Sequence, residues 1–219
     1  MSDSRPAGIM ARGPWAPERV ASRWSERAFD PGAEVTAAAD AALAELGERG
    51  SPTHDGLSAR VAGFRRAADG LVIDLEPARW ALRLVDDAHD SIASLCVVRD
   101  ADGRWLAGRR AGWVATWPGR WALGAGGAVE VGENPAETLA RELEEEWAVR
   151  PQRLTGEALI RLPTGLVLFV GLAHLAPGAE ISMDPEHDRH AWWPPEISDW
   201  PDEADTPLRM MATMLASDR

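Results

Sequence analysis

The pattern of hydrophobic and polar positions predicts a chain built from short strands and a few helices. An alanine-rich stretch over residues 34–48 has the composition of a helix and ends in glycine residues. A second helix is predicted over residues 134–148, because Asn at the N-cap and Pro at the first helical position precede a stretch without helix breakers. Residues 207–216 show a third, amphipathic helical pattern.

Strand signals fill most of the chain between these helices. Residues 57–66 and 71–76 are predicted to form a hairpin, because Asp69-Gly70 between them is a strong turn signal. Further strands are predicted at 91–99, 104–108, 121–125, 128–131, 154–162, 166–175 and 190–193, and short helices or turns after Pro77 and at 195–200. The first 33 residues contain four prolines and predict a loose arm, with a short helix over residues 18–28 left open.

The order of these elements divides the chain into unequal parts. A length of 219 residues fits one domain with an appendage, or two small domains. We expect residues 1–88 to form an N-terminal arm and a small accessory α+β region. Residues 89–219 are expected to form the main α/β domain, a mixed sheet with one helix after its fourth strand and another at its end.

One face of the predicted helix at 134–148 concentrates acidic residues. Glu142, Glu145 and Glu146 stand at positions i, i+3 and i+4 and therefore share a face, while leucines and Trp147 form a separate apolar stripe. Like charges this close repel, so the carboxylates would either take up a proton or bind a cation. Carboxylate oxygens are hard ligands that suit Mg²⁺ or Mn²⁺.

The acidic residues belong to a longer motif that consists of Gly127, Glu133 and the run Arg-Glu-Leu-Glu-Glu-Glu at 141–146. A solvated surface would explain a lone acidic triplet. The full spacing, however, matches by chance only on the order of 10⁻⁸ per starting residue at average composition. The motif resembles the Nudix box, the signature of the Nudix hydrolase family, over residues 127–149, and looser similarity extends over residues 91–217.

One position departs from the family's pattern. The glycine near the end of the box is replaced here by Ala148. If this position needs a left-handed backbone conformation, alanine costs about 1 kcal/mol or more. The change concerns the end of the helix and leaves every carboxylate in place.

The resemblance implies a Nudix-type α/β/α sandwich with a divalent-metal site. In the family, the glutamates that match Glu142, Glu145 and Glu146 bind Mg²⁺ or Mn²⁺, and the carbonyl of the residue before the box glycine, here Gly126, is often a further ligand.

The resemblance also implies that Glu133 and Arg141 meet and brace the loop before the helix. The alternative is a pair of surface charges worth under about 1 kcal/mol.

A general base is expected among the acidic residues. The family implies either a box glutamate, here Glu145, or an acid from a loop far downstream, for which Glu186 is the first choice. Glu157, Glu180 and Asp184 are its rivals.

Arginine and tryptophan near the box are candidates for substrate binding. Arg109 or its neighbour Arg110, with Arg109 as the first choice, follows a strand and would suit bidentate contact with a phosphate, although a solvent-facing pair is weighed equally. Trp117 is the candidate for stacking on a nucleobase, with a role in the core as the alternative. Three other tryptophans crowd the same segment, Trp105, Trp113 and Trp121.

The resemblance to the Nudix family, carried onto these residues, implies a divalent-metal-dependent pyrophosphohydrolase. A nucleoside diphosphate linked to another moiety, such as ADP-ribose or a nucleotide sugar, fits the accessory region best, and a nucleoside triphosphate is the next candidate. Isopentenyl-diphosphate isomerases share the fold but use a cysteine shortly before the box, where this chain has none. A non-catalytic nucleotide-binding module would usually have lost the glutamates, which are present here.

The composition restricts the kinds of molecule that the chain is expected to bind. A net charge of −12 argues against nonspecific binding to nucleic acids or anionic membranes. The single cysteine, Cys96, excludes an internal disulfide and fits a reducing cytoplasm, and we expect neither a signal peptide nor a membrane span. We expect a small-molecule nucleotide as the partner and leave a homodimer open.

Overall fold

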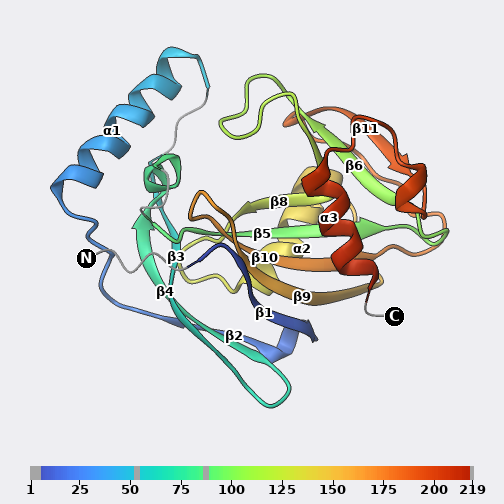
Figure 1. The fold of residues 1–219 in the computed structure, drawn as a ribbon, viewed down its shortest axis with the longest axis horizontal. Helices are drawn as coiled ribbons and strands as arrows, with labels where there is room; N and C mark the ends of the chain where they lie inside the picture. Colours follow the sequence, from blue (N-terminus) through green and yellow to red (C-terminus); the bar gives the residue numbers. More distant parts are fainter. Residues whose placement is uncertain (1–5, 52–54, 86–88, 218–219) are drawn as a thin grey trace.

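A computed structural model describes residues 6–51, 55–85 and 89–217, and its centre is a mixed sheet (Figure 1). Strands β10 and β5 are parallel, and the other neighbours are antiparallel. The order is β1-β9-β10-β5-β6-β11, with β8 paired to β5 and β7 paired to β6. The bounds are β1 Gly8–Trp15, β5 Ile92–Arg99, β6 Trp105–Arg110, β7 Trp121–Leu123, β8 Ala125–Ala128, β9 Arg153–Arg161, β10 Val167–His174 and β11 His187–Trp193.

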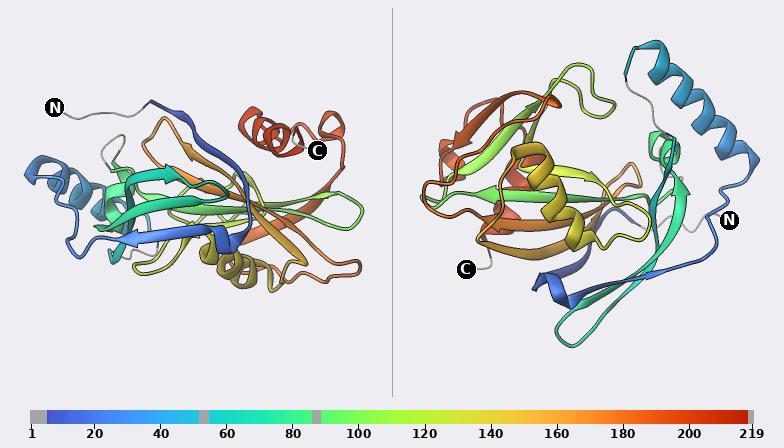
Figure 2. Two further views of the ribbon diagram at one scale, coloured as in Figure 1. Left: turned by 90° about the horizontal axis from the view of Figure 1, so that it is seen from below. Right: turned by 180° about the vertical axis from the view of Figure 1, so that it is seen from behind.

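Two helices cover opposite faces of this sheet. Helix α2 (Pro135–Trp147) lies on one face and α3 (Thr206–Ala216) on the other, as Figure 2 shows from below. Alternate residues of β5 therefore enter two different cores, Cys96 with the leucines of α2 and Val97 with Ala212 of α3. This arrangement is the predicted α/β/α sandwich with a mixed sheet.

A second, smaller sheet packs against the core on the α2 side. Strand β4 (Leu71–Arg79) lies between β2 (Val20–Trp24) and β3 (Leu57–Arg66), and the hairpin predicted over Asp69-Gly70 is confirmed. Its apolar residues share one hydrophobic cluster with the residues of α2. Helix α1 (Ala33–Glu48) packs on the 3₁₀ helix η2 (Trp80–Leu84) through a separate small cluster.

The N-terminal segment differs from the prediction of a loose arm with a short helix at 18–28. It forms β1, a single 3₁₀ turn η1 (Pro17–Arg19) and β2, so the prediction is wrong. Each strand finds its partner far along the chain, β1 beside β9 and β2 beside β4. Proline is tolerated in β1 because this strand lies at the edge of the sheet.

Other boundaries shift by a few residues. Strand β4 continues beyond the predicted end, and η2 replaces the short helix expected after Pro77, while η3 (Ile197–Asp199) lies within the predicted 195–200. The start of the predicted arm at 1–5, part of the segment before the hairpin at 52–54, and the predicted domain boundary at 86–88 lie outside the described residues. Within the part of the chain that is described, no helix is long and apolar enough to span a bilayer.

Candidate active site

The start of α2 is fixed by the predicted cap. The Asn134 side chain accepts a hydrogen bond from Ala136 N at 2.9 Å, and Glu137 reaches back to Asn134 N at 3.0 Å, which completes a capping box. Asn134 Nδ2 also donates to the Val20 carbonyl at 2.7 Å. The second sheet therefore holds the beginning of the helix that carries the glutamates.

The three glutamates of the shared face lie in different environments. Glu142 and Glu146 are buried, with exposed fractions of 8% and 4%, whereas the Glu145 side chain is 58% exposed. The carboxylate of Glu142 lies directly over Gly127, where an added Cβ would come within 2.0 Å of Oε1. The box glycine is therefore required because any side chain there would displace Glu142.

Arg141 gathers the carboxylates around the loop before α2. Its Nε lies 2.8 Å from Glu133 Oε1, and its Nη1 lies 2.7 Å from Glu142 Oε1 and 2.9 Å from Glu145 Oε2. Its Nη2 also donates to the Ala128 carbonyl at 3.1 Å. The structure thus brings together Glu133 and Arg141, the pair expected to brace this loop.

Burial changes the acidity of two of these groups. Desolvation raises the pKa of Glu142 to about 7, although the neighbouring Arg141 opposes the shift. Desolvation, with a further contribution from Glu142, raises the pKa of Glu146 to about 9. Such carboxylates hold protons near neutral pH unless a positive charge takes their place.

The chemistry of this donor set suits a divalent metal, although its side chains do not converge on one point in this arrangement. Among the described residues, no three His, Cys, Asp or Glu side chains converge as a metal cluster. Glu142 and Glu145 are instead turned toward Arg141, and Glu146 Oε1 accepts a hydrogen bond from Gly126 N at 3.3 Å. Binding a metal therefore requires at least the exposed Glu145 side chain to turn.

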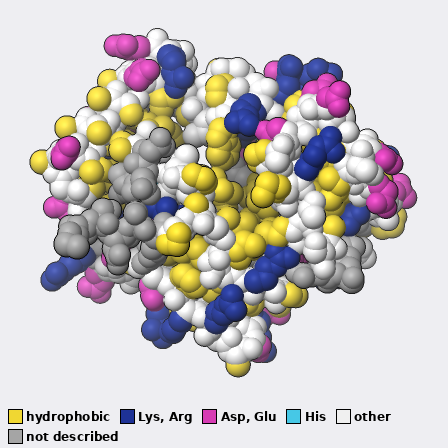
Figure 3. Space-filling view, in the orientation of Figure 1, with side chains coloured by type: hydrophobic (Ala, Val, Ile, Leu, Met, Phe, Trp, Pro, Cys, Tyr) yellow, Lys and Arg dark blue, Asp and Glu magenta, His cyan; other side chains and the backbone are white. Residues whose placement is uncertain are grey.

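The glutamates line one end of a cleft of about 510 Å³. Apolar residues from the α3 side of the sheet form its floor, and tryptophans and arginines form its walls. Figure 3 shows the face of the molecule that is hollowed in the middle, with apolar side chains gathered around the hollow. Aromatic and charged side chains that line the cleft beside the glutamates include Trp80, Arg83, Arg110, Trp113, Trp117 and Glu186.

Glu186 is the one of the four candidate loop acids that lines this cleft. Its Oε2 lies 3.2 Å from Arg110 Nη2, and its charge contributes to raising the pKa of Glu142, so Glu186 lies near the box helix. By contrast, Glu157 is buried beside Thr155, and Asp184 contacts His187. Glu180 is exposed and is not among the residues that line the cleft.

The two neighbouring arginines point in different directions, because successive residues of a strand face opposite sides. Arg109 is ion-paired with Asp188 at 2.7 Å and is not among the cleft residues, whereas Arg110 lines the cleft. The geometry therefore favours Arg110 over the first choice, Arg109, as the residue that would contact a phosphate.

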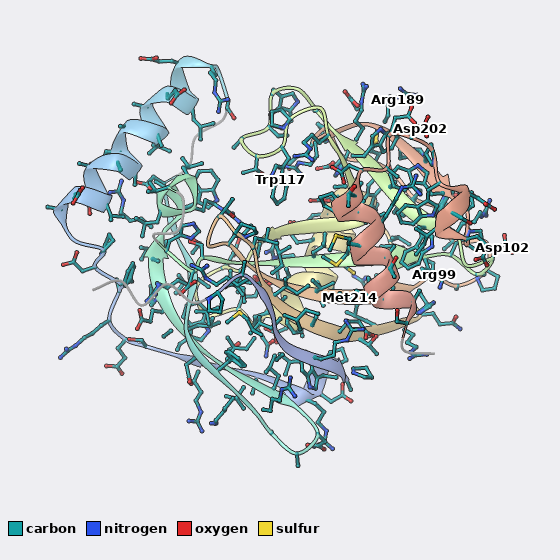
Figure 4. All side chains as sticks on the ribbon, viewed as in Figure 1. Arg99, Asp102, Trp117, Arg189, Asp202 and Met214 are labelled. Atoms are coloured by element: carbon teal, nitrogen blue, oxygen red, sulfur yellow. The ribbon has the colours of Figure 1, made fainter. Side chains whose placement is uncertain are left out.

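The tryptophans before the box divide between the core and the cleft. Trp105 is fully buried, whereas Trp113 and Trp117 are 45% and 49% exposed on the loop at 111–120. Trp117 also has a left-handed backbone with φ of 52°, which is strained for a residue of this size. Figure 4 shows Trp117 on that loop, and it lines the cleft as expected of a stacking residue.

Three cleft residues lack a sequence signal that points to them. His187 lies with Nε2 at 3.9 Å from Glu146 Oε2 and Nδ1 at 3.0 Å from Asp184 Oδ1, so it links the downstream loop to the box helix. Trp80 and Arg83 come from the N-terminal region. Their position follows from the packing of η2 on α1, which local periodicity does not reveal.

Comparison with known proteins gives one match over most of the main domain. The pattern that defines the NUDIX domain family matches residues 90–210. An octanoyltransferase from Myxococcus xanthus is 40% identical over 76 residues, which cover 30% of this chain and 20% of that protein. The chain thus matches about a fifth of the length of this curated relative.

Two solved structures are among those similar to this chain. A MutT NUDIX hydrolase from Burkholderia pseudomallei is 25% identical, with a TM-score of 0.48 over 57% of this chain and 98% of that chain. The NUDIX domain of Shewanella oneidensis NrtR, in complex with ADP ribose, is 19% identical, with a TM-score of 0.45 over 56% of this chain and 85% of that chain.

Proposed function

The chain belongs to the NUDIX domain family, and on that premise we propose that it is a metal-dependent pyrophosphohydrolase that acts on a nucleoside diphosphate linked to another moiety, of the ADP-ribose or nucleotide-sugar type. The family match covers more than half of the chain. It confirms the resemblance predicted from the sequence and supports the hydrolase assignment.

One observation carries the proposal. Three glutamates on one helix face line one end of a cleft whose other walls are aromatic and positively charged. Such a cleft suits a molecule with a phosphate part and a large planar part, because tryptophan stacks on flat rings and arginine binds phosphate. The aromatic walls are Trp80, Trp113 and Trp117.

The residues that would hold the metal are Glu142, Glu145, Glu146 and the carbonyl of Gly126. When bound, Mg²⁺ or Mn²⁺ neutralises the charge of the diphosphate and lowers the pKa of a coordinated water. Glu133 and Arg141 keep the loop and the helix together, so that these ligands come from a fixed frame.

A carboxylate of the cleft would accept the proton that the attacking water loses. Glu186, or alternatively Glu145, accepts the proton of the water that attacks one phosphorus in line with the leaving oxygen. Arg110 lies beside Glu186 and would hold a phosphate oxygen. The phosphoanhydride bond breaks, and the products are a nucleoside monophosphate and the phosphate of the second moiety.

A nucleoside triphosphate is the second candidate substrate. The presence of two arginines in the cleft, Arg83 and Arg110, favours it because a third phosphate adds negative charge. We place either activity in the cytoplasm, since the single cysteine is buried and suits a reducing compartment.

The test is a panel of ADP-ribose, nucleotide sugars and nucleoside triphosphates with Mg²⁺ or Mn²⁺, in which the released phosphate esters are measured. We expect metal-dependent cleavage of the linked diphosphates, with chelation abolishing it. Saturable nucleotide binding without turnover of any member of the panel would instead indicate a non-catalytic module.

A further inference from the structure

The N-terminal region contributes a wall of the cleft through η2. Hydrogen bonds fix the start of this short helix, from Trp80 N to the Gly56 carbonyl at 2.9 Å and from Ala81 N to Asp55 Oδ1 at 3.2 Å. Its buried side packs on α1 through Ala81 and Leu82. Its other side presents Trp80 and Arg83 to the cleft, so these two residues are held by a packed scaffold.

Arg83 lies in a different environment from the other arginines of the site. Arg110 is ion-paired with Glu186, and Arg141 is ion-paired with box glutamates. Arg83 is half-buried, its guanidinium carbon lies 5.5 Å from the centre of the Trp80 ring, and it makes no hydrogen bond or ion pair with any residue that the structure describes.

A half-buried guanidinium without a carboxylate partner is unfavourable in the free protein. Burial lowers the pKa of Arg83 to about 10, Glu142 opposes the shift, and the like charge of Arg110 adds to it. Two arginines that repel each other in a cleft are stabilised when an anion enters between them. Unfavourable arrangements of this kind concentrate at functional sites.

We propose that Arg83 binds a phosphate group of the substrate, as a second anion-binding residue of the cleft in addition to Arg110. The inference rests on the proposed function and extends it, because it gives residues 1–88 a direct part in substrate recognition. The fork of a guanidinium matches two phosphate oxygens, and the Trp80 ring, 5.5 Å from the guanidinium carbon, is near enough to contact a flat group attached to that phosphate.

The test uses α,β-methylene-ADP, whose P–C–P link cannot be hydrolysed, and adenosine, which has no phosphate. Binding of each to the full chain is measured by calorimetry in the presence of Mg²⁺. We expect Arg83→Gln to weaken binding of the analogue about tenfold and to leave adenosine unchanged, since a contact with a charged group is lost. Arg83→Lys should give an intermediate affinity for the analogue, because lysine keeps the positive charge but loses the fork of the guanidinium.

Arg66→Ala is the matched control, because Arg66 is an exposed arginine of β3 in the same region, away from the cleft. It should change neither affinity. Equal losses for the analogue and adenosine would mean that Arg83 only supports the Trp80 wall, and unchanged binding of the analogue in Arg83→Gln would mean that it makes no contact. Either result overturns the proposal, as does failure of the unaltered chain to bind the analogue.

The outcome is separable from that of the proposed function. If the substrate panel gives no turnover but analogue binding still depends on Arg83, the activity is wrong and the phosphate site stands. If turnover is found and Arg83→Gln leaves analogue binding unchanged, the activity stands and this inference fails.

Discussion

On a single turn of α2, residues of the same type acquire different properties from their surroundings. Glu146 is buried against the sheet and next to Gly126, Glu145 is exposed, and Glu144 points away from the cleft to Arg150. Substitutions along this turn therefore distinguish the effect of removing a charge in the cleft from the effect of removing a charge on the surface.

Replacing Glu146 with Gln should reduce turnover by roughly 10²-fold or more in Mg²⁺, an order-of-magnitude estimate for losing an electrostatic catalytic group. The reason is that the change removes a buried negative charge with almost no change in shape. The measurement is kcat on the best substrate of the panel. Glu144→Gln is the control and should retain normal rates, because Glu144 is exposed and does not line the cleft. Normal turnover in Glu146→Gln would remove this residue from the metal site.

The raised pKa values make stability depend on pH in a defined direction. In the metal-free protein the pKa of Glu142 is about 7 and that of Glu146 about 9, above the ordinary value of about 4.3. The folded state therefore binds more protons than the unfolded state, so the free energy of unfolding should fall as pH rises through these values. Mg²⁺ should reduce the fall, because a cation favours the ionised carboxylates.

Urea denaturation at pH 5, 7 and 9, in chelator and in Mg²⁺, measures this dependence. Glu146→Gln cannot ionise at this position and should flatten the metal-free curve. A metal-free stability that rises with pH over the same range would contradict the proton linkage assigned to these two groups.

At the scale of elements, the end of α2 shows the effect of the one departure from the family's motif. Ala148 is the C-cap and has a left-handed backbone, with φ of 52° and ψ of 35°. The sequence predicted strain at this position if its backbone were left-handed. That conformation is present, and so is the condition for the strain. Ala148 N still donates to the Glu144 carbonyl at 2.9 Å, so the helix ends in the usual way despite the strain.

Ala148→Gly should stabilise the protein by about 0.5–1 kcal/mol, because glycine adopts this conformation without a Cβ clash but gains more freedom in the unfolded chain. Ala140→Gly is the matched control, since Ala140 is exposed in the middle of the same helix and its replacement should destabilise by about 1 kcal/mol. Urea denaturation measures the free energy of unfolding, which should rise for Ala148→Gly and fall for Ala140→Gly. Destabilisation by Ala148→Gly would show that the left-handed cap carries no strain.

Elements with strong local signals were predictable, and those that depend on distant partners were not. Helix α2 begins at the predicted Pro135, because the Asn134 cap and the proline at the first helical position are encoded locally. Strands β1 and β2 have no comparable signal, since their ladders form with β9 and β4. Arg110 and Arg109 illustrate the same limit at the site, because the face of a strand that lines a cleft is decided by tertiary packing.

At the scale of the whole molecule, the N-terminal region and the main domain share a core and a site. Strand β1 pairs with β9 at the edge of the main sheet, and the apolar residues of β4 lie in the same cluster as those of α2. The box loop is also tied to this region, because Trp24 Nε1 donates to the Glu133 carbonyl at 3.2 Å. The sequence predicted an accessory region, but not that it would complete the hydrophobic core.

A fragment of residues 89–219 should therefore fail to fold as a stable domain, although the family match lies entirely within it. Removing residues 1–88 exposes one face of the core around α2 and leaves β9 without its neighbour β1. It also deletes the wall of the cleft that η2 forms. At about 25 cal/mol per Å² of apolar surface, losing the burial of several large side chains costs an amount comparable with the whole stability of most small domains. Circular dichroism and urea denaturation of the fragment, beside the full chain, measure the effect. We expect a weak or non-cooperative transition and no saturable binding of nucleotide. A cooperative transition with the stability of the full chain would show instead that residues 1–88 are an appendage to an independent domain, because the shared cluster would then contribute little to folding.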